Sequence, residues 1–500
     1  MVLRRAIIVI LGLLLQIGLT LFVYLFLVEN ILIIKMFYAA FGTIIVLFLI
    51  KNSKNFSYSL PWIVIILLFP IIGTLLYLIL GRNKKRSKTL KRIVAEEENI
   101  KKYLIQDESI KNKCISNGKL NYISNYANYP VSTNNNVKYY SLGDYAFPQM
   151  LKELEKAKKF IFFEYFIVNH GKMWDSILEI LERKAKEGVD VRVMYDDLGC
   201  LSSLDENYPK KLEEKGIKCV CFNRLNFIAG IIMNNRDHRK ILIIDGKVAF
   251  SGGINISDEY INIGSKYGHW KDNAFKISGD GVWNYTVMFL TMWNSYIKED
   301  ADFTEYKYKF NNDKDTGFVA PYGETPLDDE VVGEDIYLNI INQAKKYVYI
   351  LTPYLIIDTD MVKALTLASK RGVDVRIVIP GIPDKKIVYT LSESYIPPLL
   401  EAGVKVYKYS PGFVHSKVFV SDDNVATVGT INMDYRSLYL HFECGCYFED
   451  CSVVKDIKKD VSETIDKSEL ISSGKVNIIK SLWQAILRLF APLMWEVYYE

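Results

Sequence analysis

The chain contains two copies of one unit, and this duplication constrains its fold more than any other feature. Four short segments recur in the same order at separations of 177–187 residues. The first set is Ala157–Lys159, Gly188–Val193, Gly216–Lys218 and His238–Lys240, and the second is Ala344–Lys346, Gly372–Ile377, Gly403–Lys405 and His415–Lys417. Each copy alternates short β-branched or aromatic runs with helix-like stretches, which is typical of layered α/β folds. We therefore expect two α/β sandwich domains related by a pseudo-two-fold axis.

The domain boundaries follow from the repeat and from changes in composition. The 500 residues are enough for two or three domains of ordinary size. A polar stretch with runs of Asn and Asp separates the two copies. We expect a membrane anchor at 1–92, a connector at 93–130, a first domain at 131–305, a linker at 306–332, a second domain at 333–475 and a C-terminal amphipathic segment at 476–500.

Three N-terminal stretches are long and apolar enough for helices that cross a bilayer, which takes roughly 20 residues. They span residues 6–28, 31–50 and 60–80. Seven basic residues follow between Arg82 and Arg92, and such clusters stay on the cytoplasmic side. We expect a multi-pass protein of the cell membrane with cytoplasmic catalytic domains. Two crossings with a re-entrant third segment bent at Pro70, or three crossings, both remain open.

Each copy of the repeat carries the same constellation of polar residues. A histidine is followed by a lysine 2 positions later, an aspartate 7 positions later and an asparagine 17 positions later. If the histidine and the lysine lie on one strand, their side chains project to the same face. The two copies are then expected to bring their histidines and lysines into one pocket. The residues are His238, Lys240, Asp245 and Asn255 in the first copy, and His415, Lys417, Asp422 and Asn432 in the second.

Such a pocket is suited to a phosphodiester. Two ammonium groups and two carboxamides neutralise and donate to the non-bridging oxygens, most strongly as charge builds in the transition state. One neutral histidine attacks phosphorus and forms a covalent phosphohistidine, while the other, protonated, donates to the leaving alkoxide. The backbone at Gly253 and Thr430 is expected to approach the ligand closely. Neither a metal nor another cofactor is required.

These motifs resemble the paired HKD motifs of the phospholipase D superfamily, and with its apolar N-terminus the chain is similar to bacterial cardiolipin synthases. The segments that carry the closer match are Asn235–Lys240, Gly252–Asn255, His269–Asp272, Thr352–Tyr354, Gly429–Ser437, Phe442–Glu443 and Pro492–Leu493. The resemblance implies duplicated phospholipase D-like domains. It also implies transfer of a phosphatidyl group from one phosphatidylglycerol to another, which gives cardiolipin and glycerol. The implied partners are membrane lipids, and no nucleic acid is expected.

The resemblance further implies roles for individual residues. His238 is expected to be the nucleophile and His415 the general acid and base, although a pseudosymmetric pair can also work the other way round. Asp272 and Glu443 are expected to orient the two histidines, holding one ring nitrogen so that the other is ready for its chemistry.

The remaining motif residues and histidines are interpreted more simply. Asp245 and Asp422 complete the catalytic motifs, but the strand hypothesis puts them far from the histidines, so we expect structural roles first. His170, His269 and His441 do not recur in this way, and we expect ordinary polar roles for them.

Other functions stay open. A membrane phospholipase D hydrolase, or a transferase that uses another alcohol or phosphatidylethanolamine, would carry the same motifs. A nucleic-acid phosphodiesterase shares the chemistry, but the net charge of only +4 argues against a polyanion binder. A non-catalytic membrane scaffold is disfavoured because neither motif copy is degraded. The C-terminal amphipathic segment is either an interfacial helix or a helix packed on the second domain, and the sequence says nothing about oligomeric state.

Overall fold

A computed structural model describes residues 14–20, 31–52, 56–78, 88–224, 235–264, 266–300, 302–310, 316–472 and 477–493. The chain forms two compact units, which are described separately: residues 1–85 with 485–500, and residues 86–484. The larger unit holds both copies of the repeat.

The first copy folds into a seven-stranded mixed sheet with the order β1-β9-β7-β6-β2-β3-β4. Its interior strand β2 is buried along its whole length, which fits its nearly continuous run of apolar side chains. β2 runs parallel to β3 and antiparallel to β6. The strands are β1 (Asn135–Tyr140), β2 (Phe160–Tyr165), β3 (Asp190–Asp196), β4 (Lys218–Phe222), β6 (Lys240–Ile244), β7 (Val248–Gly252) and β9 (Ala274–Gly279).

The second copy repeats this topology. Its sheet has the order β10-β19-β17-β16-β11-β13-β14-β20, so the first seven strands correspond one by one to those of the first sheet. The strands are β10 (Phe318–Glu324), β11 (Tyr347–Leu351), β13 (Asp374–Pro380), β14 (Lys405–Tyr409), β16 (Val418–Ser421), β17 (Val425–Gly429), β19 (His441–Glu449) and β20 (Ser468–Leu470). The predicted duplicated α/β fold is confirmed.

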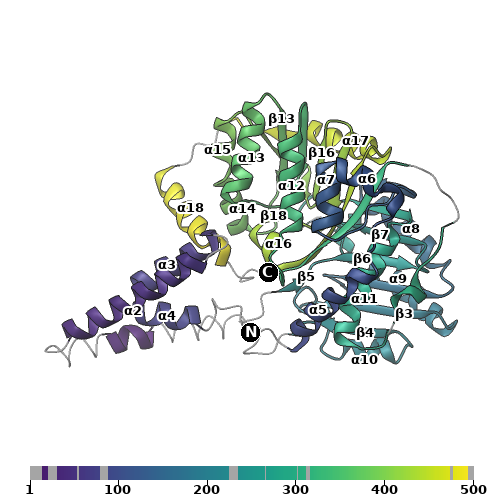
Figure 1. Cartoon of the computed structure of the whole chain (residues 1–500), viewed down its shortest axis with the longest axis horizontal. Helices are drawn as coiled ribbons and strands as arrows, with labels where there is room; N and C mark the ends of the chain where they lie inside the picture. The colour runs from purple at the N-terminus through teal and green to yellow at the C-terminus, as the bar shows by residue number, and fades with distance from the viewer. Residues whose placement is uncertain are drawn as a thin grey trace. The chain divides into compact units, whose positions relative to one another are not determined.

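Helices flank both sheets, and Figure 1 shows α12 and α13 beside one another in the second half. The helices before and within the first half are α5 (Lys88–Asn99), α6 (Glu108–Ser116), α7 (Gly118–Asn121), α8 (Gly143–Leu154), α9 (Lys172–Lys186), α10 (Tyr208–Glu213) and α11 (Val282–Tyr296). Those of the second half are α12 (Val332–Gln343), α13 (Thr359–Lys370), α14 (Lys386–Glu393), α15 (Ile396–Glu401), α16 (Tyr435–Tyr439) and α17 (Val453–Asp466), followed by α18 (Ile478–Phe490).

The two halves share one hydrophobic core. Helix α11 follows β9 and helix α17 follows the corresponding β19, and residues of both helices join one cluster of buried residues with strands of both sheets. All but the last residue of α11 is buried, which fits its lack of any charged side chain. The halves are therefore one compact unit rather than two separately packed domains.

The predicted linker at 306–332 needs correction. It contains strand β10, which lies at one edge of the second sheet and pairs with β19. The pattern of β10 is interrupted by Pro321 and Gly323, which weaken a strand signal. Proline is tolerated on an edge strand because one side of that strand makes no ladder hydrogen bonds. The second sheet therefore begins before the boundary predicted at 333.

Within the part of the chain that the structure describes, the smaller unit contains helices α2 (Ile31–Asn52), α3 (Phe56–Leu68) and α4 (Pro70–Leu76), together with the end of α18. Helix α3, which accommodates Pro61, ends before Pro70, because a proline disfavours helical backbone at the residue before it and Phe69 has φ of −134° and ψ of 73°. Among the described residues, no helix combines the length and apolarity that a membrane crossing requires. The predicted segments 31–50 and 60–80 fall largely on these helices, whereas most of segment 6–28 and of the basic flank up to residue 87 lies outside the described residues.

Candidate active site

The two motif histidines lie between strands that connect the two halves. His238 follows β5 (Arg236–Asp237), which pairs in parallel with the start of β19 in the second half. His415 follows β15 (Gly412–Val414), which pairs in parallel with β8 (His269–Lys271) in the first half. Each histidine is thus positioned by a strand pair that crosses between the copies.

The hypothesis that each histidine shares a strand with its lysine is wrong. Lys240 begins β6, but His238 precedes that strand, and Lys417 lies just before β16. The physical reason is that the histidine backbone bonds to the other half instead of continuing the ladder. The His238 N–H donates to the Phe442 carbonyl and the His415 N–H donates to the Lys271 carbonyl, each at 2.8 Å.

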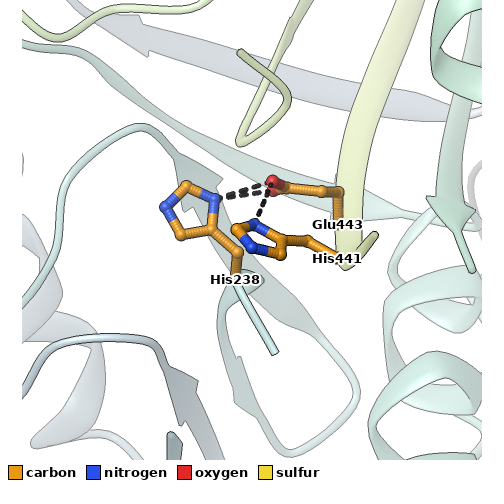
Figure 2. Close-up of side chains that lie close together, drawn as sticks. All are labelled: His238, His441 and Glu443. Carbon is orange, nitrogen blue, oxygen red and sulfur yellow. Dashed lines mark hydrogen bonds and ion pairs between the residues drawn. The ribbon is translucent and has the colours of Figure 1, made fainter. Parts of the chain in front are cut away.

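Each imidazole is held by a carboxylate from the opposite half. His238 Nδ1 lies 2.8 Å from both carboxylate oxygens of Glu443 (Figure 2). His415 Nδ1 lies 2.6 Å from Asp272 Oδ2. A carboxylate on Nδ1 fixes the tautomer with the proton on that nitrogen, which leaves Nε2 able to attack or to exchange a proton.

The motif lysines are buried beside the histidines. Lys240 Nζ donates to the His238 carbonyl at 2.7 Å, and Lys417 Nζ donates to the His415 carbonyl. Burial lowers the pKa of Lys240 to about 8 and that of Lys417 to about 7. Because an anion nearby favours the charged form, a bound phosphodiester would raise both pKa values again. The site therefore gains positive charge where a phosphate would lie.

The two constellations lie close enough to act on each other. Burial lowers the pKa of His238 well below its usual value, and Lys240, Lys417 and His415 lower it further. Burial and Lys417 lower the pKa of His415 to about 4, with a further contribution from Lys240. Both rings are therefore neutral at neutral pH before an anion binds.

Asp245 and Asp422 lie at the far end of the motif strands. Asp245 follows β6 and accepts hydrogen bonds from the backbone N–H groups that open β2, those of Lys158, Lys159 and Phe160. Asp422 follows β16 and does the same at the start of β11. The structure does not bring these two carboxylates to the histidines, so their place among the catalytic residues is corrected to a structural one.

Gly253 and Thr430 lie against the carboxylates rather than in open space for a ligand. A Cβ atom on Gly253 would lie 2.0 Å from Asp272 Oδ1, so only glycine fits. Thr430 Oγ1 donates to Glu443 Oε2 at 2.5 Å. Both residues therefore contact the carboxylates that hold the histidines, and their predicted contact with a ligand stays a prediction.

Asn255 and Asn432 are both buried. Asn255 Oδ1 accepts from the Ile167 N–H at 3.1 Å, and Asn255 Nδ2 donates to the Tyr260 hydroxyl at 2.8 Å. The Tyr260 ring in turn packs edge-on against His415, with 5.3 Å between the ring centroids. Asn255 therefore supports the surroundings of His415 in this structure, and its predicted contact with a phosphate stays a prediction, as does that of Asn432.

His441 is the site residue that sequence reasoning missed. Its ring centroid lies 5.6 Å from that of His238, and its Nδ1 lies 3.6 Å from Glu443 Oε1 (Figure 2). A signal was present, because His441 precedes Glu443 by 2 positions on strand β19 and so shares its face.

His238, His441 and Glu443 place three potential metal-ligand atoms within 4.8 Å of one another. Cationic groups surround them, and the pKa of His441 is lowered well below its usual value by burial and then by Arg436, Arg236 and Lys240. These charges repel a divalent cation and favour an anion, so we assign no metal to this cluster.

The chain matches the models of a known family. A model described as the phospholipase D-like domain of cardiolipin synthase matches residues 150–274 and, again, residues 337–465. The chain belongs to the cardiolipin synthase family. A second model, for the phospholipase D-nuclease N-terminal region, matches residues 39–82.

Relatives of this family match along most of the chain. A cardiolipin synthase from Halalkalibacterium halodurans is 36% identical over 83% of this chain and 84% of its own length. An uncharacterized protein from Streptococcus mutans is 45% identical over 90% of this chain and 99% of its own length. Among solved structures, phosphatidylserine synthase from Haemophilus influenzae matches with a TM-score of 0.58 and 16% identity, over 75% of this chain and 98% of that one. The last likeness supports the fold alone.

Proposed function

We propose that this member of the cardiolipin synthase family makes cardiolipin by transferring a phosphatidyl group from one phosphatidylglycerol to another and releasing glycerol. The observation that carries the proposal is the pair of buried, neutral imidazoles, each with Nδ1 held by a carboxylate of the opposite half. Two such rings beside two buried lysines suit an anionic phosphodiester.

The reaction proceeds in two displacements. His238 Nε2 attacks the phosphorus of the donor, and the bond from phosphorus to the glycerol oxygen breaks. His415 gives its Nε2 proton to that oxygen, and glycerol leaves. The free glycerol hydroxyl of a second phosphatidylglycerol then gives its proton to His415 and attacks phosphorus. The bond from phosphorus to His238 breaks, and both histidines return to their starting state.

The charges of the site support this division of labour. His415 is neutral before substrate binds, because burial and Lys417 lower its pKa. The negative charge of the bound phosphodiester raises that pKa, so the His415 ring takes up a proton at Nε2 from solvent and can then give it to the leaving oxygen. Glu443 balances the positive charge that develops on the His238 ring once Nε2 is bonded to phosphorus.

We further propose that the enzyme is attached to the cytoplasmic face of the cell membrane. The apolar segments at 6–28, 31–50 and 60–80 and the basic residues that follow them support this proposal. Helix α18 supports it too, because Lys480 and Gln484 bond to α14 while Ile479 and Leu482 are exposed. An apolar face turned outward is favoured at a lipid surface. Tags on the two termini, probed for accessibility from each side of the membrane, test the orientation, and a C-terminal tag on the outer side contradicts it.

The test of function uses the full-length protein in vesicles of phosphatidylglycerol alone. The proposal expects cardiolipin and glycerol in equal amounts. Phosphatidic acid without cardiolipin would show a hydrolase instead, and cardiolipin formed only after phosphatidylethanolamine is added would show a different donor or acceptor. His238→Ala and His415→Ala are each expected to lose activity by about 10³-fold or more.

A matched control separates loss of chemistry from loss of structure. His170 lies outside both motifs and its side chain is 56% exposed. His170→Ala is expected to keep wild-type activity and the wild-type unfolding temperature. Substantial cardiolipin synthesis by either motif variant would contradict the two-histidine mechanism.

A further inference from the structure

One of the positions at which the two halves differ lies beside the reacting histidines. In the first half, Trp270 precedes the carboxylate Asp272 by 2 positions, and its ring centroid lies 5.6 Å from that of His415. In the second half, His441 takes the same position before Glu443, and its ring lies at the same 5.6 Å from His238. The first half thus has a hydrophobic indole where the second half has an imidazole.

The groups around His441 determine which of its ring nitrogens carries the hydrogen. Arg436 Nε donates to His441 Nε2 at 3.3 Å. Because a guanidinium has no acceptor, Nε2 is the unprotonated nitrogen of a neutral ring and Nδ1 carries the hydrogen. The ring is neutral because burial, followed by the charges of Arg436 and Arg236, lowers the pKa of His441 well below its usual value. Its N–H therefore faces Glu443 Oε1, at 3.6 Å.

Glu443 depends on such donors to stay ionised. Burial raises its pKa well above the usual value, and the charge of Asp434 acts in the same direction. Lys240 opposes this shift, as do the hydrogen bond from Thr430 and the hydroxyl of Ser437. His238 and Lys417 also face this carboxylate. A carboxylate has about four lone-pair sites, so it can accept from His238, Thr430 and His441 together.

Asp272 in the first half does not need a further hydrogen-bond donor to stay ionised. Burial acts to raise its pKa, but His415, Lys417 and the Asn273 N–H reverse the direction, and the pKa lies below its usual value. Trp270 does not donate to it. The partners of the carboxylate that supports His415 thus lower its pKa, whereas the pKa of the carboxylate that supports His238 lies above its usual value.

We propose that His441 is a positioning residue that donates its Nδ1 hydrogen to Glu443 and thereby keeps that carboxylate ionised and aligned on His238 during phosphoryl transfer. This role rests on the proposed function only in that His238 carries the covalent intermediate. The separation of 3.6 Å closes to hydrogen-bond length as positive charge develops on the His238 ring, since catalytic hydrogen bonds are often long before substrate binds. The His441 N–H and the Glu443 carboxylate then both stabilise the phosphohistidine.

Two substitutions separate the donor from the ring. His441→Phe keeps an aromatic ring against His238 but removes the N–H. His441→Asn loses the ring but places an amide N–H near the position of Nδ1. His441→Phe is expected to lower kcat by about 10- to 100-fold with little change in KM, as expected for a hydrogen bond to a charged group. His441→Asn is expected to recover activity to within about threefold of the wild type.

The pH profile distinguishes this role from simple packing. Loss of a donor raises the pKa of Glu443, so a higher pH is needed to ionise it. The acidic limb of the kcat profile is therefore expected to move up by about one pH unit in His441→Phe and to return in His441→Asn. Arg436→Met leaves the ring in place but removes the contact that fixes its tautomer, and it is expected to shift the limb in the same direction by a smaller amount.

Each rate is measured on phosphatidylglycerol vesicles and on the chromogenic diester bis(4-nitrophenyl) phosphate. The diester reports attack by His238 whatever the natural lipid is. If cardiolipin is not formed but the diester shows the expected shift, the proposed lipid is wrong and the role of His441 stands. If His441→Phe has the wild-type pH profile on both substrates, or if His441→Asn is as impaired as His441→Phe, the role of His441 is refuted.

Discussion

The third residue of the motif offers a sharp test, because the structure predicts that Asp245→Ala damages stability and spares chemistry. Asp245 accepts backbone N–H groups at 3.0 Å from Lys158, 2.7 Å from Lys159 and 3.0 Å from Phe160. A hydrogen bond to a charged group contributes about 1.5–3 kcal/mol net, and bonds that share one carboxylate are not additive. Asp245 also has φ of 54°, where Ala is disfavoured by roughly 1 kcal/mol. We expect Asp245→Ala to lower the free energy of unfolding by about 3–5 kcal/mol.

The assay compares unfolding temperature with activity per folded molecule. At roughly 2 °C per kcal/mol for a large unit, the midpoint of unfolding should fall by about 5–10 °C, followed by tryptophan fluorescence at one fixed scan rate. The matched variant Asp245→Asn keeps one acceptor oxygen and tolerates the backbone conformation, so it should lose about half as much. At a temperature where Asp245→Ala is folded, kcat should stay within about twofold of the wild type, because Asp245 lies about 16 Å along the strand from Lys240.

The result that refutes this reasoning is the reverse pattern. An unchanged unfolding midpoint together with a loss of kcat of about 100-fold or more would give Asp245 a direct part in the reaction. The geometry of the turn after β6 would then be a poor guide to the role of this carboxylate.

Three further outcomes are expected. His415→Ala given bis(4-nitrophenyl) phosphate, whose 4-nitrophenolate leaves without a proton, should accumulate a 4-nitrophenyl phosphoryl group that maps to His238 by peptide mass spectrometry. The same group on another residue would reverse or discard the assigned roles. Burial places the pKa of Lys417 at about 7 and that of Lys240 at about 8, and the ammonium form binds phosphate. Measured kcat/KM should therefore fall as pH rises through about 7 to 8, whereas a flat profile would show that these charges do not limit binding. Dialysis against a chelator should leave the rate within about twofold of the starting value, and a loss restored by zinc would show that the His238 cluster needs a metal.

Much of the fold was predictable because each recurring segment is short and continuous in the sequence. The recurring glycine and apolar segments, such as Gly188–Val193 and Gly372–Ile377, mark corresponding strands β3 and β13. Strand β10 escaped prediction, since Pro321 and Gly323 disturb its pattern and its pairing with β19 is a contact between distant parts of the chain.

The site was predictable in its residues but not in its connections. Spacing identified His238 and His415, and the family resemblance pointed to Glu443 and Asp272. It did not reveal that each histidine takes the carboxylate of the opposite half. That arrangement depends on contacts between residues 205 and 143 positions apart in the sequence. The neighbouring His441 was passed over because its role depends on that crossed arrangement.

The two copies have diverged around the carboxylates Asp272 and Glu443, each of which holds the histidine of the opposite half. The histidines and lysines that would face the phosphate are the same in both halves, whereas the residues that touch the carboxylates differ, with Thr430 where the first half has Gly253. Two identical sites could not easily assign one ring to attack and the other to proton transfer. A carboxylate whose ionisation depends on several donors and one that is ionised by its direct partners provide different surroundings for chemically identical rings. Divergence at the carboxylates can therefore separate the roles of the histidines without altering the groups that bind substrate.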